Sequence, residues 1–270
     1  MQFFAFLKLL RQRKIEQAVV FHAPWWIGFA LWLARVPRRV GRYSQWHSFL
    51  FFNFGVRQKR SLSQAHESEY NMELIHLLID EPYEMITPLS LRHTEAESVL
   101  KKFQLSNIKY CLVHPGMNGS ALNWPTESYQ LLVETLLLNQ HVVITGTKTD
   151  APYIQPLYEK LENHSSVTWL HEKLSGDELI AILQKAEVVV APSTGVAHLS
   201  ASLGTPTIGI YSNVIAESAK RWGPIGAKVM VFEPKSDPTT EKNPEVMKEI
   251  EVAEVLNAIK NFGIPISEPT

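Results

Sequence analysis

Short apolar runs alternate with amphipathic stretches from about residue 108 to residue 211. Such runs are typical of buried strands, whereas apolar positions spaced three and four apart predict helices. The predicted strands are Tyr110–His114, His141–Thr145, Val167–Leu170, Glu187–Ala191 and Thr205–Tyr211. The predicted helices between them are Pro125–Leu138, Ala151–Leu161, Asp177–Gln184 and Val196–Leu203. This alternation predicts parallel βαβ units, and therefore an α/β fold with a doubly wound sheet.

The chain before residue 108 alternates less regularly. The elements predicted up to residue 80 are a helix at Phe3–Arg13, a strand at Gln17–Phe21, an amphipathic helix at Trp25–Ala34, a short strand at Arg39–Tyr43 and a helix at Ser63–Asp80. The pattern of residues 81–107 predicts a connection that contains a short Ile86–Leu91 segment and a helix at Thr94–Phe103. We expect a domain boundary near residues 100–107. A last amphipathic helix is predicted at Asn243–Asn261.

Composition is that of an ordinary globular protein, with 45% hydrophobic and 20% charged residues and a net charge of −1. The single cysteine, Cys111, excludes an internal disulfide framework and fits a reducing compartment. Because Cys111 lies in an apolar run, we expect it to be a buried core residue.

Charge is distributed unevenly along the chain. Residues 1–60 contain eleven Lys or Arg side chains and one acid, Glu16, interleaved with Trp and Phe. This combination suits a surface that meets anionic lipid headgroups. A basic domain face that complements an acidic one is the alternative, and nucleic acid is a competing partner that we do not expect, since no nucleic-acid-binding module accompanies the charge.

We expect no transmembrane segment or secretory signal. The apolar stretch Ala18–Ala34 is short and is interrupted by His22, Pro24 and Gly28, so a strand followed by a helix fits it better than a membrane span. At the N-terminus the charges follow the apolar run instead of preceding it, and no small-residue cleavage site is present.

The clearest motif is the run Ala191–His198, where an apolar strand ends in a Pro-Ser-Thr-Gly turn and a small-residue helix begins at once. Ser193, Thr194 and Gly195 would place two hydroxyls and free backbone N–H groups at a helix N-terminus, where the helix dipole favours an anion. The plainer alternative is a Ser/Thr helix cap with a glycine for packing. His198, one turn further along, is either a polar core residue or a ligand contact.

A second motif occupies the loop within His114–Pro125, which also follows a strand and precedes a helix. Gly116 and Gly119 would let the backbone approach a ligand closely, and Asn118 and Ser120 offer hydrogen-bond donors. The ligand crevice of an open α/β sheet lies at the carboxyl ends of its strands, so both loops should lie at one edge.

A third segment, Lys220–Pro224, could carry positive charge and an aromatic plane to the same crevice. No G-x-G-x-x-G follows a predicted strand and no G-K-[ST] is present, which argues against a nucleotide-linked dehydrogenase and a P-loop protein.

Together these segments resemble the bacterial lipopolysaccharide heptosyltransferases, glycosyltransferase family 9. The resemblance rests on His114–Pro125, Ala191–Gly204 and Trp222-Gly223-Pro224, and more weakly on Arg38–Gly41 and His66–Asn71. It implies a GT-B-like α/β fold, in which two Rossmann-like domains face a cleft. The domains implied are residues 1–105 (incomplete, acceptor side) and 106–240 (nucleotide-sugar binding), followed by a C-terminal helix and tail at 241–270.

The resemblance also implies the reaction: inverting, metal-independent transfer of heptose from ADP-heptose to a lipid-anchored lipopolysaccharide core acceptor. No cofactor beyond this nucleotide-sugar substrate is expected. The protein would be cytoplasmic, peripheral on the inner face of the cytoplasmic membrane. Carried over by position, the donor-binding residues are Gly116, Asn118, Gly119, Ser120, Ser193, Thr194, Gly195 and His198. An inverting transfer needs the charge of the leaving diphosphate stabilised by preorganised donors, which agrees with the turn at Ser193–Gly195.

Two positions near the donor site depart from the family's pattern. The family usually has a lysine two residues before the Trp of the first loop, where this chain has Leu122. The cation at the donor phosphates is then absent or supplied elsewhere, with Lys148, Lys220 and Arg221 as candidates. Many members also have Asp where Ser193 stands.

The family's general base is the Asp of an N-terminal Gly-Asp loop, and this chain contains no Gly-Asp pair before Gly176-Asp177. Because a base is needed to deprotonate a sugar hydroxyl, we expect weak or absent catalysis and leave the catalytic residue unassigned. His22, at a predicted strand end, is a candidate substitute or a structural turn residue. A non-catalytic relative that binds nucleotide-sugar or glycolipid is therefore the alternative function. A sugar-nucleotide epimerase would need carboxylates and a His in the cleft, which the two loops do not offer.

Overall fold

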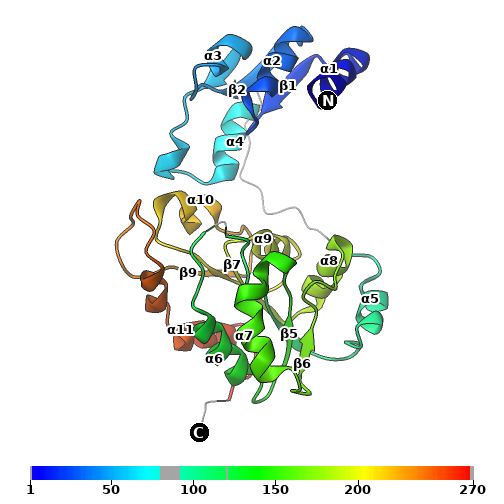
Figure 1. The fold of residues 1–270 in the computed structure, drawn as a ribbon, viewed down its shortest axis with the longest axis vertical. Coiled ribbons are helices and arrows are strands. Elements are labelled where there is room, and N and C mark those ends of the chain that lie inside the picture. Colours follow the sequence, from blue (N-terminus) through cyan, green and yellow to red (C-terminus); the bar gives the residue numbers. More distant parts are fainter. Residues whose placement is uncertain (1, 80–91, 120, 268–270) are drawn as a thin grey trace. The chain divides into compact units, whose positions relative to one another are not determined.

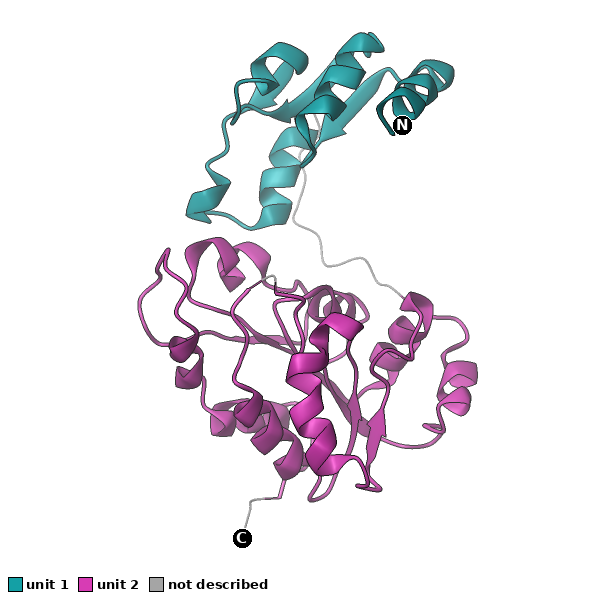
Figure 2. Cartoon of the chain, in the orientation of Figure 1, with its two compact units in different colours: residues 1–86 teal, residues 87–270 magenta. Residues whose placement is uncertain are grey.

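The computed structural model describes residues 2–79, 92–119 and 121–267, and its contacts divide the chain into two compact units, Met1–Ile86 and Thr87–Thr270 (Figure 2). Each unit is built on its own parallel sheet flanked by helices (Figure 1). The expected α/β class is therefore confirmed in both. The predicted Ile86–Leu91 segment and Ser120 lie outside the described residues.

The first unit contains a three-stranded parallel sheet in the order β1-β2-β3. Its strands are β1 (Gln17–Val20), β2 (Arg38–Arg42) and β3 (Phe54–Val56). Its helices are α1 (Gln2–Arg13), α2 (Trp25–Leu33), α3 (Ser48–Phe51), the 3-10 helix η1 (Arg60–Leu62) and α4 (Glu67–Ile75). The sequence predicted α1, β1, α2 and β2 to within a few residues, but it missed α3 and β3, which are too short to show a period.

Helix α2 is not amphipathic, contrary to the prediction. It consists only of Trp, Ile, Gly, Phe, Ala and Leu. Ala30 and Leu31 are buried, while Trp25 and Trp32 on the opposite side are 54% and 48% exposed. The exposed face is therefore aromatic. Among the described residues, no helix is long and apolar enough to cross a membrane.

Helix α4 begins later than predicted, at Glu67 instead of Ser63. The ring of His66 accepts a hydrogen bond from the N–H of Ser68, and the Glu69 carboxylate accepts one from the N–H of His66 at 3.0 Å. This reciprocal capping box fixes the helix start. Ser63 instead has left-handed backbone, with φ of 45°, and cannot lie within a helix.

The second unit contains a six-stranded parallel sheet in the order β6-β5-β4-β7-β8-β9. Its strands are β4 (Tyr110–Val113), β5 (His141–Ile144), β6 (Val167–Trp169), β7 (Val188–Pro192), β8 (Thr207–Ile210) and β9 (Val229–Phe232). The sequence predicted the first five and missed β9. The strand order reverses between β4 and β7, which is the place where open α/β sheets bind ligands. Both loops that the sequence singled out follow these two strands.

Helices cover both faces of this sheet (Figure 1). They are α5 (Ala96–Lys102), α6 (Thr126–Leu136), α7 (Ala151–Leu161), α8 (Gly176–Lys185), α9 (Gly195–Ser202), α10 (Ala219–Trp222), α11 (Val252–Asn261) and the 3-10 helices η2 (Lys148–Asp150), η3 (Ile215–Glu217) and η4 (Pro244–Glu249). Cys111 and Val113 of β4 pack in the core layer with α6, α7 and α11, whereas Tyr110 and Leu112 pack with α5, α8 and α9. Cys111 is fully buried, as predicted, and burial raises the pKa of its thiol to about 12.

Two segments that the sequence assigned outside the central domain pack within the second unit. Helix α5 lies against α8, and Lys102 pairs with Glu178. The final predicted helix consists of η4 and α11, and Val255 and Ile259 of α11 belong to the same core as α6. The contacts therefore divide the chain at residue 86, upstream of the predicted boundary, because α5 buries its apolar face on the second sheet's helices.

Candidate functional site

The turn after β7 presents an open helix N-terminus. Thr194 occupies the N-cap position of α9, with φ of −138° and ψ of 167°, but its side chain makes no capping hydrogen bond. Its hydroxyl is buried and has no hydrogen-bond partner among the described residues. The first N–H groups of a helix have no partner within that helix. The plain capping interpretation therefore does not account for this turn, in which neither the Thr194 hydroxyl nor the first N–H groups of α9 have a partner within the helix.

Gly195, the first residue of α9, faces open space. A Cβ built at this position meets no atom within 4 Å. Its backbone is not in the left-handed region, so glycine is not needed there for conformation. The missing side chain instead keeps the space in front of the helix N-terminus open.

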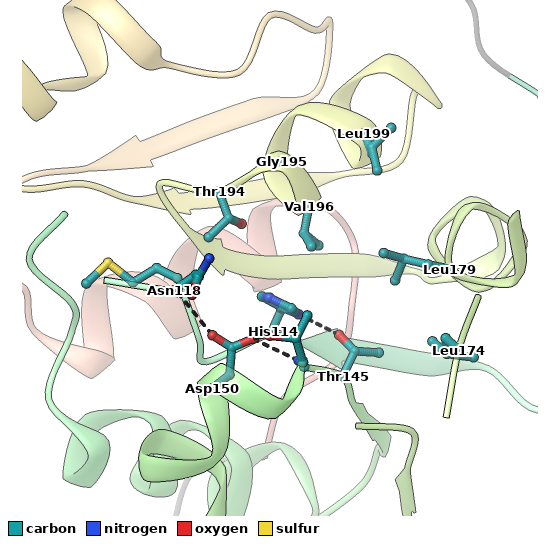
Figure 3. A pocket seen from close by; sticks show the side chains of 13 residues that line it. His114, Asn118, Thr145, Asp150, Leu174, Leu179, Thr194, Gly195, Val196 and Leu199 are labelled. Atoms are coloured by element: carbon teal, nitrogen blue, oxygen red, sulfur yellow. Dashed lines mark hydrogen bonds between the residues drawn. The ribbon is translucent and has the colours of Figure 1, made fainter. Parts of the chain in front are cut away.

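The first cavity, of about 460 Å³, lies between the turn at Thr194–Gly195 and the loops that follow β4 and β5 (Figure 3). One part of its wall is apolar, with Met117, Leu174, Leu179, Val196 and Leu199. The polar part consists of His114, Asn118, Thr145, Thr147, Asp150 and Thr194. A cavity with an apolar part and a polar part has the character of a small-molecule site, and its volume lies in the range of such sites.

His114 lies at the end of β4 and is buried. Its Nδ1 is 3.0 Å from Oγ1 of Thr145, at the end of the neighbouring strand β5. Burial lowers the pKa of His114 to about 4, although the nearby Asp150 carboxylate opposes this. His114 is therefore neutral at pH 7.

Asp150 connects two of the loops. Its Oδ2 accepts hydrogen bonds from the N–H and hydroxyl of Thr147 at 2.8 and 2.7 Å, and its Oδ1 accepts one from the N–H of Asn118 at 3.1 Å. Burial opposes ionisation of Asp150, but these hydrogen bonds outweigh it and hold the pKa of the carboxyl below its ordinary value. A Cβ at Gly116 would lie 2.0 Å from this carboxyl group, so the glycine is what admits it.

Of the three described residues that the sequence singled out in the first loop, one lines a cavity. Asn118 lines the first cavity. Gly116 lies behind Asp150, and Gly119 has φ of +71°, which allows the chain to turn. Both glycines shape the loop, and their contact with a ligand stays a prediction.

A second cavity, of about 440 Å³, adjoins the first and shares Thr194 and Gly195 with it. Its other lining residues are Ala121, Ser193, His198, Ala216, Glu217 and Trp222. Buried Tyr211 connects the turn after β7 with the Lys220–Pro224 segment. Its hydroxyl donates a hydrogen bond to the carbonyl of Trp222 at 2.9 Å and is also hydrogen-bonded to the Ser193 side chain. The structure thus brings all four residues predicted after β7 to the walls of one cavity.

Leu122, at the position of the family's usual lysine, is buried in the core. None of the lysines or arginines in the described part of the chain lines either cavity. Of the three candidates, Arg221 has its guanidinium 4.7 Å from the ring centroid of the lining residue Trp222, and Lys148 follows the lining residue Thr147 in sequence. The charged residue in the second cavity is Glu217, which the sequence analysis missed, as it missed Thr145 and Asp150.

His22, the candidate substitute base, belongs to the first unit. It follows β1 and lines a hollow of about 20 Å³ together with Arg42 and His47. Gly176-Asp177 opens α8, where Asp177 lies 3.0 Å from the His93 ring. This pair therefore has a structural role at a helix start.

A doubly wound sheet with paired cavities at its switch point, on either side of a helix N-terminus, defines a Rossmann-like α/β protein. Comparison with known families identifies it further. The chain belongs to glycosyltransferase family 9, the heptosyltransferase family, whose model matches residues 4–250.

Individual relatives agree with this assignment. A putative glycosyltransferase of Haemophilus influenzae is 28% identical over 279 residues, covering 95% of this chain and 79% of that protein. The structure of E. coli ADP-heptose lipopolysaccharide heptosyltransferase II has a TM-score of 0.77 at 18% identity, over 95% of this chain and 78% of that one. E. coli heptosyltransferase WaaC with ADP gives 0.68 at 17% identity, over 96% and 77%. The fold is therefore GT-B-like, as predicted.

Proposed function

We propose that this glycosyltransferase transfers heptose from ADP-heptose to a lipopolysaccharide core acceptor. The observation that carries the proposal is the open N-terminus of α9, with the unpartnered Thr194 hydroxyl and the empty space at Gly195 between two cavities. The bound ADP of the structurally similar E. coli heptosyltransferase supports a nucleoside diphosphate as the ligand.

The donor would lie across the helix N-terminus. Its nucleoside would occupy the first cavity, against the apolar wall that includes Leu179 and Leu199. Its diphosphate would accept hydrogen bonds from the first N–H groups of α9 and from Thr194, where the helix dipole also favours negative charge. Ser193 and His198 would border the diphosphate from the second cavity, and Asn118 would border the nucleoside.

The same groups explain how the chain would assist the reaction. In an inverting transfer the bond from the sugar to the diphosphate breaks, and negative charge accumulates on the leaving phosphate. Donors fixed in the folded protein stabilise this charge without reorganising, and they need no metal ion to do so. We propose a metal-independent mechanism on this basis.

A relative that binds the donor without transferring it is the second candidate. It is favoured by the structural use of Asp177, whose carboxylate is held by His93 at the start of α8. Incubation with radiolabelled ADP-heptose and a heptose-deficient lipopolysaccharide core, together with calorimetric titration, separates the two candidates. Transfer of label supports the enzyme, and binding without transfer supports the non-catalytic relative.

We also propose that the first unit meets an anionic membrane surface. Its exposed side chains include Phe4 of α1, Trp25 and Trp32 of α2, and Phe49 of α3, on helices that neighbour one another. Aromatic side chains together with the basic residues of this segment suit the interface of an anionic bilayer. The acceptor that we propose is anchored in such a bilayer.

A further inference from the structure

We infer that Glu217 recognises the sugar of the nucleotide-sugar donor, and that the second cavity is the sugar compartment. This inference rests on the proposed donor function and deepens it. Glu217 ends η3 and lines the second cavity together with Trp222, the last residue of α10. It is the charged residue among the described lining of that cavity.

The carboxylate of Glu217 is fixed in place by three neighbours. Its Oε2 accepts hydrogen bonds from the N–H of Leu122 at 3.2 Å and from the hydroxyl of Ser212 at 3.3 Å. Its Oε1 pairs with the ammonium of Lys242. The side chain of Glu217 is only 11% exposed, so the position of the carboxylate is set by the folded protein and not by solvent.

This arrangement keeps a negative charge in a cavity that adjoins the proposed diphosphate position. A carboxylate repels phosphate, so the diphosphate would stay at the Thr194–Gly195 turn, and the Glu217 end of the cavity favours an uncharged group. Lys242 offsets the cost of burying the carboxylate. Its positive charge also reduces the repulsion between the Glu217 carboxylate and the diphosphate.

Glu217 keeps capacity for a ligand. A carboxylate has about four acceptor positions, and the three neighbours leave one. A sugar hydroxyl is a donor that suits it. Trp222 adds an aromatic surface, and its indole N–H is already bound to the carbonyl of Ala216 at 2.9 Å, so the ring is held in one position. The carboxylate of Glu217 would accept a hydrogen bond from a sugar hydroxyl, and the ring of Trp222 would pack against the apolar C–H face of the sugar.

The other acidic residues of this region do not share these features. Glu233 accepts a hydrogen bond from the N–H of Ala219 and lines neither cavity, and Glu241 is exposed in the segment that precedes Lys242. Glu241 therefore serves as a matched control for the loss of one carboxylate.

Calorimetric titration of the full chain with ADP-heptose and with ADP tests the inference. The wild-type chain should bind ADP-heptose more tightly than ADP. Glu217→Gln should weaken ADP-heptose binding about tenfold, the loss expected for one hydrogen bond to a charged group, and should leave ADP within about twofold. Glu241→Gln should leave both affinities unchanged. Glu217→Asp, which keeps the charge but withdraws the carboxylate by one methylene, should reproduce the selective loss if the Gln variant does not fold.

Three results would overturn the inference: equal wild-type affinities for the two ligands, an equal loss for both ligands in the Glu217 variants, or no loss for ADP-heptose. These results differ from a failure of the proposed function, in which the wild-type chain would bind neither ADP nor ADP-heptose.

Discussion

His114 illustrates what single residues contribute to this site. The imidazole is buried at the end of β4, and its pKa is lowered to about 4, below the ordinary value of about 6.5 in an unfolded chain. Between these two values the unfolded chain takes up a proton at this side chain and the folded chain does not. The contribution of His114 to stability is therefore complete above about pH 6.5 and is lost progressively as the pH falls towards 4.

Replacement of His114 by Asn should remove this pH dependence, since Asn can still bond to Thr145 but does not titrate. We expect the wild-type chain to lose more stability than the His114→Asn variant between pH 7 and pH 5, by roughly 1 kcal/mol per pH unit below 6.5. Denaturant midpoints of both proteins at the two pH values measure this difference. Parallel losses would show that His114 titrates normally in the folded chain.

The loop between β4 and α6 shows how elements are held together. Asp150, at the end of η2, accepts a hydrogen bond from Asn118, and Gly116 gives its carboxyl group room. The sequence identified both loop residues as ligand contacts because it showed small and polar residues after a strand. It could not show Asp150 beside them, since that residue comes from a different loop and its approach depends on the fold.

Gly116→Ala should therefore destabilise the second unit by about 1–3 kcal/mol, because its methyl group would displace the Asp150 carboxyl group. The matched control is Gly176→Ala at the first position of α8, where a Cβ meets no atom within 4 Å. That variant should be unchanged or slightly more stable. Thermal denaturation followed by circular dichroism compares them, and equal midpoints would contradict the role assigned to Gly116.

The aromatic face of α2 gives a prediction for membrane binding. The double variant Trp25→Ser/Trp32→Ser should sediment less with phosphatidylglycerol vesicles than the wild-type chain, because both rings are exposed. Leu131→Ser/Leu138→Ser on the second unit, with similar exposure, is the control and should not change sedimentation. Equal sedimentation of all three proteins would contradict the proposal that the aromatic face of α2 binds an anionic membrane.

The contribution of positive charge to membrane binding can be tested by charge reversal, and residues of α1 suit this experiment better than residues of β2. Arg39 of β2 donates a hydrogen bond to the carbonyl of Phe51 at 2.7 Å, so reversing its charge would disturb the fold. Lys8 and Arg13 of α1 are exposed and can be reversed instead.

At the scale of the whole molecule, the sequence predicted the central sheet well. Five strands followed from apolar runs, and the two loops meet because parallel strands end at one edge. The sequence did not identify Glu217, because nothing in the spacing of residues 212–224 relates it to the loop that contains Leu122. It also did not show that α5 packs against α8, since a charged helical pattern does not indicate which sheet the helix will cover.

The central claim, that the N-terminus of α9 holds the donor diphosphate, is tested most directly by calorimetric titration of ADP into three proteins. Gly195→Leu should lose at least about tenfold in affinity while keeping its denaturation midpoint, because the new side chain occupies open space in front of the helix. Gly176→Leu, at the equally open first position of α8, should bind ADP as the wild-type chain does. Unchanged ADP binding by Gly195→Leu would contradict the account.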